Sequence, residues 1–291
     1  SGKIVLIMEP AYPPYVDANI IAGNKIIHVP SGEQDGFAPL PDESVQADVI
    51  YICSPNNPTG AVFNYEKLKT WVNYANRIGA VILFDAAYEA FIEEEEIPHS
   101  IFEIEEAKTC AIEICSLSKT AGFTGTRLGY TLIPKALKRN GMSLNEMWVR
   151  NRTTKTNGVS YIIQNGGKAV FTEKGQKQIY ERIRIYKENA KVLMEALSEL
   201  GIWYCGGKNA PYIWMKCPRN FLIICCMKFR SLEHRERDLA YAEKDIFGFL
   251  LLDRQKIRKK QQKGLSDYFQ NGRKEILDER GSESIKIMIV F

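Results

Sequence analysis

Residues 48–85 read "DVIYICSPNNPTGAVFNYEKLKTWVNYANRIGAVILFD", and this stretch decides the fold. Its two ends, 48–54 and 80–84, are nearly continuous apolar runs, which are typical of strands buried on both faces. Between them, Asn64 can cap a helix that Gly79 ends. The apolar residues of that helix recur at helical spacing: Leu68, Trp71, Val72, Ala75 and Ile78. A strand, a helix and a strand with short connections predict a parallel β-α-β unit.

The same pattern continues along the chain. Further apolar runs at 111–115 and 128–133 extend the predicted sheet. We therefore expect an α/β fold with a mostly parallel central sheet flanked by helices, which occupies residues 1–178 as a large domain. A linking helix at 179–201 and a strand at 212–216 begin a smaller, partial α+β domain that spans 179–218. The buried apolar stripe of the predicted helix at 179–201 is expected to comprise Ile183, Ala190, Leu193, Leu197 and Leu200.

After Pro218 the character of the chain changes. Residues 219–291 mix apolar bursts with dense charge and keep no steady period, so we expect a divergent tail of undefined structure. The basic cluster at 254–263, "RQKIRKKQQK", reads as an exposed charged helix face. A net charge of +4 is too small to indicate a nucleic-acid partner.

Composition narrows the class of protein further. No apolar run is long enough to span a bilayer and no signal peptide is seen, so no membrane partner and a cytoplasmic location are expected. The chain begins without an initiator methionine, which indicates a start within a domain and leaves open a plastid-targeting segment ahead of it. Three separated histidines predict no metal site. Seven cysteines, with neither zinc nor disulfide spacing, indicate a reducing compartment.

Polar residues follow successive strands of the predicted sheet, where open α/β sheets bind ligands. Lys119 can act as a nucleophile toward a carbonyl and form a Schiff base. Asp85 ends a buried strand and needs a cationic partner, for which a protonated ring nitrogen would serve. Donors to a ring oxygen and to a phosphate are also present: Asn57, Tyr88, Ser116, Ser118 and Arg127. Together these residues describe a pyridoxal phosphate (PLP) site.

Each piece also has a plainer interpretation. Asp85 suits a helix N-cap, and both Ser116 and Ser118 suit caps. Lys119 suits a solvated loop and Arg127 a surface ion pair. Residues 54–60, "SPNNPTG", suit a turn. The cofactor interpretation is favoured because the candidate ligands fall at three successive strand ends.

Several segments resemble the signatures of one family. "SPNNPTG" (54–60), "FDAAYEAF" (84–91) and "SLSKTAGFTGTRLGY" (116–130) look like those of fold-type I PLP-dependent aminotransferases. More narrowly, four segments are similar to LL-diaminopimelate aminotransferases: "EPAYPPYVDANIIAG" (9–23), "SKTAGFTGTRLGYTLIPK" (118–135), "TTKTNGVSYIIQ" (153–164) and "GGKNAPYIWMKCP" (206–218). The resemblance runs from about Ile4 to Pro218.

The resemblance implies a role for each matched residue. Lys119 would form the Schiff base and carry the proton, and Asp85 would pair with the pyridine nitrogen. Asn57 and Tyr88 would contact the ring oxygen. Ser116, Ser118 and Arg127 would hold the phosphate. Tyr12 would lie near cofactor and substrate. Asn157 would reach cofactor or substrate, either in its own subunit or in the neighbouring subunit of a homodimer.

Two family features are not found in the sequence. The N-terminal arm that completes the phosphate site would precede Ile4, and the glycine-rich segment with a carboxylate-binding arginine is not recognisable in 219–291. The abrupt change after Pro218 is what a frameshift, a misjoined exon or a mispredicted gene end would produce. We therefore expect this chain by itself to bind PLP weakly.

The resemblance predicts an LL-diaminopimelate:2-oxoglutarate aminotransferase of lysine biosynthesis, with amino acid and 2-oxo acid substrates. Within the same class, an aspartate-, alanine- or aromatic-specific transaminase or a PLP lyase would use the same ligands. From another class, an inactive fragment or a non-catalytic protein of this fold stays open. The presence of Lys119 with its partners favours the enzyme.

Overall fold

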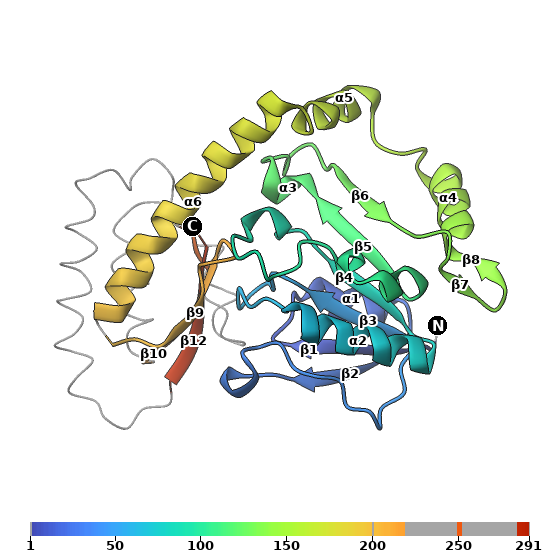
Figure 1. Ribbon diagram of the computed structural model, residues 1–291, viewed down its shortest axis with the longest axis horizontal. Helices are drawn as coiled ribbons and strands as arrows, with labels where there is room; N and C mark the ends of the chain where they lie inside the picture. The colour runs from blue at the N-terminus through green and yellow to red at the C-terminus, as the bar shows by residue number, and fades with distance from the viewer. Residues whose placement is uncertain (1, 200, 219–248, 252–283, 291) are drawn as a thin grey trace. The chain divides into compact units, whose positions relative to one another are not determined.

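The computed structural model describes residues 2–199, 201–218, 249–251 and 284–290. The described chain forms two compact units (Figure 1). Unit 1 comprises the described residues within 1–185 and 208–210, and unit 2 comprises the described residues within 186–207 and 211–291. Leu200, the basic cluster at 254–263 and most of the predicted tail lie outside the described residues. The domain division made from the sequence stays a prediction.

Unit 1 is built on a six-stranded sheet with the order β2-β1-β3-β4-β5-β6. Its strands are β1 (Ile4–Glu9), β2 (Lys25–Pro30), β3 (Val49–Cys53), β4 (Val81–Asp85), β5 (Ala111–Ser116) and β6 (Gly129–Leu132). The first five strands pair in parallel and β6 is antiparallel. The predicted mostly parallel α/β sheet is therefore confirmed. The chain order reverses between β1 and β3, which is the type of position where open α/β sheets bind ligands.

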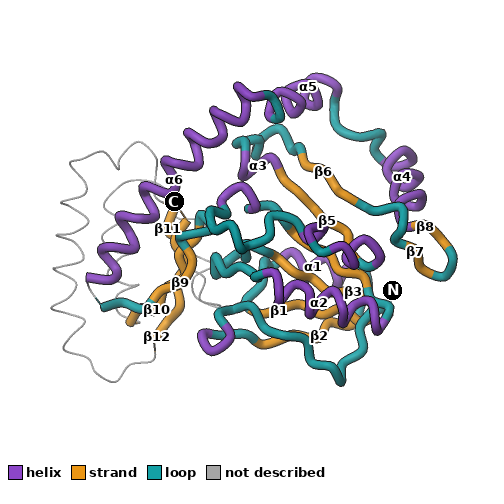
Figure 2. Tube along the Cα trace, viewed as in Figure 1, coloured by secondary structure: helices purple, strands orange, loops and turns teal. Residues whose placement is uncertain are grey.

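Helices connect these strands (Figure 2). The α-helices are α1 (Pro14–Ile21), α2 (Tyr65–Ile78), α3 (Leu117–Thr120), α4 (Leu144–Lys155), α5 (Tyr161–Val170) and α6 (Glu173–Glu199). Short 3-10 helices are η1 (Glu33–Asp35), η2 (Glu89–Phe91), η3 (Ile101–Glu103) and η4 (Glu105–Thr109), and a small hairpin is formed by β7 (Lys138–Arg139) and β8 (Met142–Ser143). None of the described helices is long and apolar enough to cross a bilayer.

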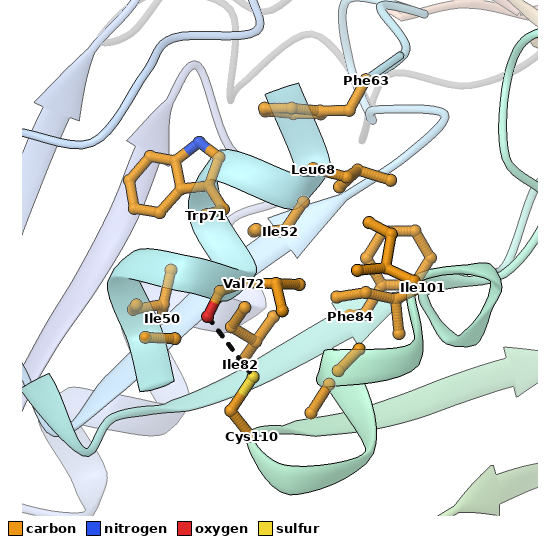
Figure 3. Close-up of a cluster of buried hydrophobic side chains, with 14 of the residues drawn as sticks. Ile50, Ile52, Phe63, Leu68, Trp71, Val72, Ile82, Phe84, Ile101 and Cys110 are labelled. Atoms are coloured by element: carbon orange, nitrogen blue, oxygen red, sulfur yellow. Dashed lines mark hydrogen bonds between the residues drawn. The ribbon is translucent and has the colours of Figure 1, made fainter. Parts of the chain in front are cut away.

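The helix α2 shows why the β-α-β pattern folds as predicted. The side chain of Asn64 accepts a hydrogen bond from the backbone N–H of Lys67 (2.9 Å), and Gly79 ends the helix in the left-handed region (φ 76°). Between these caps the apolar stripe faces the sheet. Figure 3 shows Leu68, Trp71 and Val72 of α2 beside the strand side chains Ile50, Ile52, Ile82 and Phe84, all of them fully buried. This packing supplies the apolar burial that holds the sheet together.

Unit 2 contains a four-stranded sheet with the order β11-β12-β10-β9. Its strands are β9 (Tyr204–Gly206), β10 (Tyr212–Pro218), β11 (Phe249–Leu251) and β12 (Ser284–Val290). The predicted strand at 212–216 is thus confirmed as part of β10, which pairs antiparallel with both β9 and β12. Two strands of the sheet come from the segment expected to be a tail of undefined structure.

The long helix predicted at 179–201 begins earlier, at Glu173. The hydroxyl of Thr172 accepts a hydrogen bond from the N–H of Gly175 (3.1 Å) and so caps the first turn. A Cβ atom at Gly175 would lie 2.1 Å from the carbonyl oxygen of Ala169, so this turn needs a glycine. Of the predicted stripe, Ala190, Leu193 and Leu197 are buried.

Replacing Leu68 by alanine tests the packing of α2 on the sheet. The side chain is fully buried, so Leu68→Ala should lower the free energy of unfolding of unit 1 by about 2–5 kcal/mol. The exposed position Asn73 on the same helix provides the control, since Asn73→Ala should change it by less than about 0.5 kcal/mol. Urea unfolding measures both, and equal effects would contradict this packing.

Candidate active site

The strand register gathers the candidate ligands at one edge of the sheet. Cys53 at the end of β3 lies beside Asp85 at the end of β4, and Asp85 lies beside Ile114 near the end of β5. The residues that follow these parallel strands therefore leave the sheet at the same edge. Those sequence candidates are Asn57 after β3, Asp85 and Tyr88 at and after β4, and Ser116, Ser118 and Lys119 at and after β5.

Arg127 reaches this edge by a different route. Because β6 is antiparallel, its first residue, Gly129, pairs with Ser116 at the end of β5. A Cβ atom at Gly129 would lie 2.6 Å from the carbonyl oxygen of Cys115, so only glycine allows this close approach of the strands. Arg127, two residues earlier, has a left-handed backbone (φ 57°), and its guanidinium Nη1 donates to the carbonyl oxygen of Thr124 (2.9 Å).

Asp85 is a half-buried carboxylate held by two neutral donors. Its Oδ2 accepts a hydrogen bond from the hydroxyl of Tyr15 (2.5 Å), and its Oδ1 accepts one from the N–H of Ala87 (3.0 Å). Burial raises the pKa of Asp85, while these two hydrogen bonds act to lower it. Among the described residues, no cation contributes to this balance. The site therefore has an acceptor for a positively charged ligand atom, which a protonated pyridine nitrogen fits.

Lys119 lies on α3 with its amino group 5.8 Å from the ring centroid of Tyr88. Lys119 is exposed to solvent, but part of its side chain lies against the protein. This partial loss of water lowers the pKa of Lys119, and the positive charge of Arg127 lowers it further. A lowered pKa increases the fraction of neutral amine, the form that attacks a carbonyl. Tyr88 itself is buried, with 5% of its surface exposed.

The hydroxyls of the two serines differ in their surroundings. Ser116 is the N-cap of α3, and its Oγ accepts a hydrogen bond from the N–H of Ser118 (3.2 Å). Ser116 therefore caps α3, which was the plainer interpretation of this residue. Ser118 is buried in the first turn of the same helix. Together with Arg127, these hydroxyls place a guanidinium and two donors at the edge where a phosphate would bind, and their binding of phosphate stays a prediction.

The structure gives no contact between the remaining candidates, Asn57, Tyr12 and Asn157, and either Lys119 or Asp85 among the described residues. Asn57 lies in the loop after β3, half-buried, and its N–H hydrogen-bonds to the Cys53 sulfur. Tyr12 precedes α1 and is 43% exposed. Asn157 follows α4 with a left-handed backbone (φ 52°), and no contact found among the described residues joins it to Lys119 or Asp85. The roles expected for these three side chains stay predictions.

Tyr15 is the functional residue that the sequence analysis missed. It lies in α1, the helix that leaves β1 at the same edge of the sheet, and only the register of β1 with β3 brings it to Asp85. A faint signal exists in "AYPPY" (11–15), where Tyr12 and Tyr15 lie three residues apart at the start of the helix. Their rings meet edge-on at a centroid distance of 5.6 Å.

The chain is similar in sequence to known proteins. The sequence pattern of the aminotransferase class I and II family matches residues 1–258, which extends past Pro218. The chain is 48% identical over 227 residues to an LL-diaminopimelate aminotransferase of Lachnospira eligens, covering 74% of this chain and 56% of that protein. It is 51% identical over 222 residues to one from Azobacteroides pseudotrichonymphae, covering 74% and 55%.

A solved structure shows the same similarity. The L,L-diaminopimelate aminotransferase from Chlamydomonas reinhardtii superposes with a TM-score of 0.72 at 38% identity, covering 78% of this chain and 59% of that chain. The chain thus spans about half to three-fifths of the length of the relatives it matches.

The interaction between Arg127 and Lys119 can be tested directly. Arg127→Gln removes a positive charge near the amine, so the pKa of Lys119 should rise toward its ordinary value. The pH dependence of reductive methylation at Lys119, followed by peptide mass spectrometry, measures this shift. Arg150→Gln on α4 is the control, because Arg150 is not among the groups that act on Lys119. An unchanged titration of Lys119 in Arg127→Gln would contradict the described geometry.

Proposed function

The chain belongs to the class I and II aminotransferase family, and from this premise we propose that it acts as an LL-diaminopimelate aminotransferase. The reaction would move an amino group between LL-diaminopimelate, or its cyclic oxo form tetrahydrodipicolinate, and 2-oxoglutarate or glutamate in lysine biosynthesis. The proposal is supported by two relatives named LL-diaminopimelate aminotransferase, whose sequences are 48% and 51% identical to this chain over the matched residues. Members of the family are generally PLP-dependent and typically dimeric, and we extend both properties to this chain.

One observation carries the chemistry. Two groups lie at the ends of adjacent parallel strands: the half-buried carboxylate of Asp85, which has no described cationic partner, and the amine of Lys119, whose pKa is lowered. A pyridine ring with an aldehyde needs these two groups, one for its nitrogen and one for its carbonyl carbon. The residues present therefore fit pyridoxal phosphate.

The proposed roles of the protein residues are to balance charge, to hold the cofactor in position and to transfer a proton. When bound, pyridoxal phosphate supplies the electron-accepting ring through which amino groups are exchanged. The ionised Asp85 keeps the ring nitrogen protonated. Lys119 would hold the cofactor through its amino group and would take up and return the proton at the substrate α-carbon. Arg127 with the hydroxyls of Ser116 and Ser118 would hold the phosphate, and Asn57 with Tyr88 would orient the ring.

Loading the purified chain with PLP tests this function. The parent chain should develop the visible absorbance band of lysine-bound cofactor, and Lys119→Ala should lose the band. The same variant should lower turnover by about 10²–10⁴-fold or more, because it removes the general acid–base group. Lys135→Ala, an exposed lysine outside the site, is the matched control and should keep both.

The choice of amino donor forms a separate test. LL-diaminopimelate should change the visible band at lower concentrations than aspartate, alanine or an aromatic amino acid does. A stronger response to aspartate would replace the proposal by an aspartate aminotransferase. A band that persists in Lys119→Ala would contradict the assignment of the lysine.

A further inference from the structure

Tyr15 donates a hydrogen bond to the carboxylate that the proposed function needs most. Its hydroxyl lies 2.5 Å from Oδ2 of Asp85, and the two residues come from different elements, α1 and β4. We propose that Tyr15 is a positioning residue that holds Asp85 ionised and in one orientation for the ring nitrogen of the cofactor. The functional part of this inference rests on the proposed function, whereas the effect of Tyr15 on Asp85 does not.

The ring of Tyr15 is fixed from two sides. Tyr51 on β3 packs against it at a centroid distance of 4.8 Å with an interplanar angle of 33°, and Tyr12 meets it edge-on. Its backbone is also fixed, because the side-chain amide of the buried Asn19 donates to the carbonyl oxygen of Tyr15 (2.8 Å). The hydroxyl therefore has little freedom, which lowers the entropic cost of holding it on the carboxylate.

The groups around the pair identify Tyr15 as the donor. The described titratable groups that act on the pair are Cys53 from β3 and the two partners themselves, while the neighbouring β5 residue is the apolar Ile114. Burial raises the pKa of Cys53 and raises the pKa of Tyr15 well above its ordinary value, so both keep their protons across the physiological range. Tyr15 can then donate its hydroxyl proton to Asp85 in a hydrogen bond across the physiological pH range.

Loss of the Tyr15 hydroxyl would change how strongly Asp85 binds a proton. Without the Tyr15 hydroxyl, Asp85 would keep only the N–H of Ala87 as a described donor, and its proton affinity would rise. A carboxylate of higher proton affinity takes up the proton that it should leave on the ring nitrogen. Tyr15 thereby acts on the cofactor through Asp85 and makes no direct contribution to the reacting atoms.

The first arm of the test uses the chain without cofactor. Because burial raises the pKa of folded Asp85 above its unfolded value, this group costs stability as pH rises from the unfolded pKa through the folded pKa. Tyr15→Phe moves the folded pKa higher, so its destabilisation should be small at acid pH and larger at neutral pH. Thermal unfolding should show a Tm lowered by about 4 °C or more at pH 8 and by clearly less at pH 4.5.

Tyr74→Phe is the matched control for this arm. Tyr74 is buried and Tyr15 is half-buried, and both hydroxyls donate a hydrogen bond, but that of Tyr74 goes to the neutral carbonyl oxygen of Val45 (2.7 Å). Its loss should therefore lower the Tm by the same amount at both pH values. A Tyr15→Phe effect as independent of pH as that of Tyr74→Phe would overturn the proposal.

The second arm measures the cofactor through Asp85. Tyr15→Phe should weaken PLP binding and shift the pH titration of the visible band, whereas Tyr15→Phe added to Asp85→Asn should change neither further. An equal effect of Tyr15→Phe in both backgrounds would show a direct contact and contradict a positioning role. If the parent chain binds no PLP, the proposed function fails, and the first arm alone decides whether Tyr15 controls the ionisation of Asp85.

Discussion

The parallel pairing of β3, β4 and β5 is the constraint on which the rest of the structure depends. It brings the ends of three strands to the same edge of the sheet, so Asn57, Asp85 and Lys119 leave the sheet at one edge although they are far apart in sequence. The pairing in turn depends on the apolar face of α2, which covers the strands and excludes water from them. A substitution that disturbs the packing of α2 would therefore also move the candidate site residues at the strand ends.

Partial removal of water shifts the pKa values of Asp85 and Lys119 in opposite directions. It raises the pKa of the half-buried Asp85 and lowers that of Lys119, whose side chain lies only partly against the protein, because the neutral form of each group is then favoured. A neutral amine suits a nucleophile, but a neutral carboxyl would not hold a protonated ring nitrogen. The hydrogen bonds from Tyr15 and Ala87 oppose this second effect. The donors around the carboxylate are thus as important as the carboxylate itself.

Patterns within single elements could be read from the sequence, and contacts between distant elements could not. The caps Asn64 and Gly79 and the buried strands around them agree with expectation, because each depends on local spacing. Tyr15 was missed because its importance arises only when β1 pairs with β3. Likewise, the strand β12 gains its pairing from the distant β10, so its irregular surroundings in sequence did not reveal it.

Comparing PLP with its 1-deaza analogue, in which carbon replaces the ring nitrogen, tests the central claim most directly. The claim is that Asp85 receives its positive partner from the cofactor. The account predicts that the purified chain binds the analogue at least about tenfold more weakly than PLP, equivalent to ~1.4 kcal/mol, and that Asp85→Asn removes the difference. Equal affinity of the unaltered chain for the two compounds would contradict it.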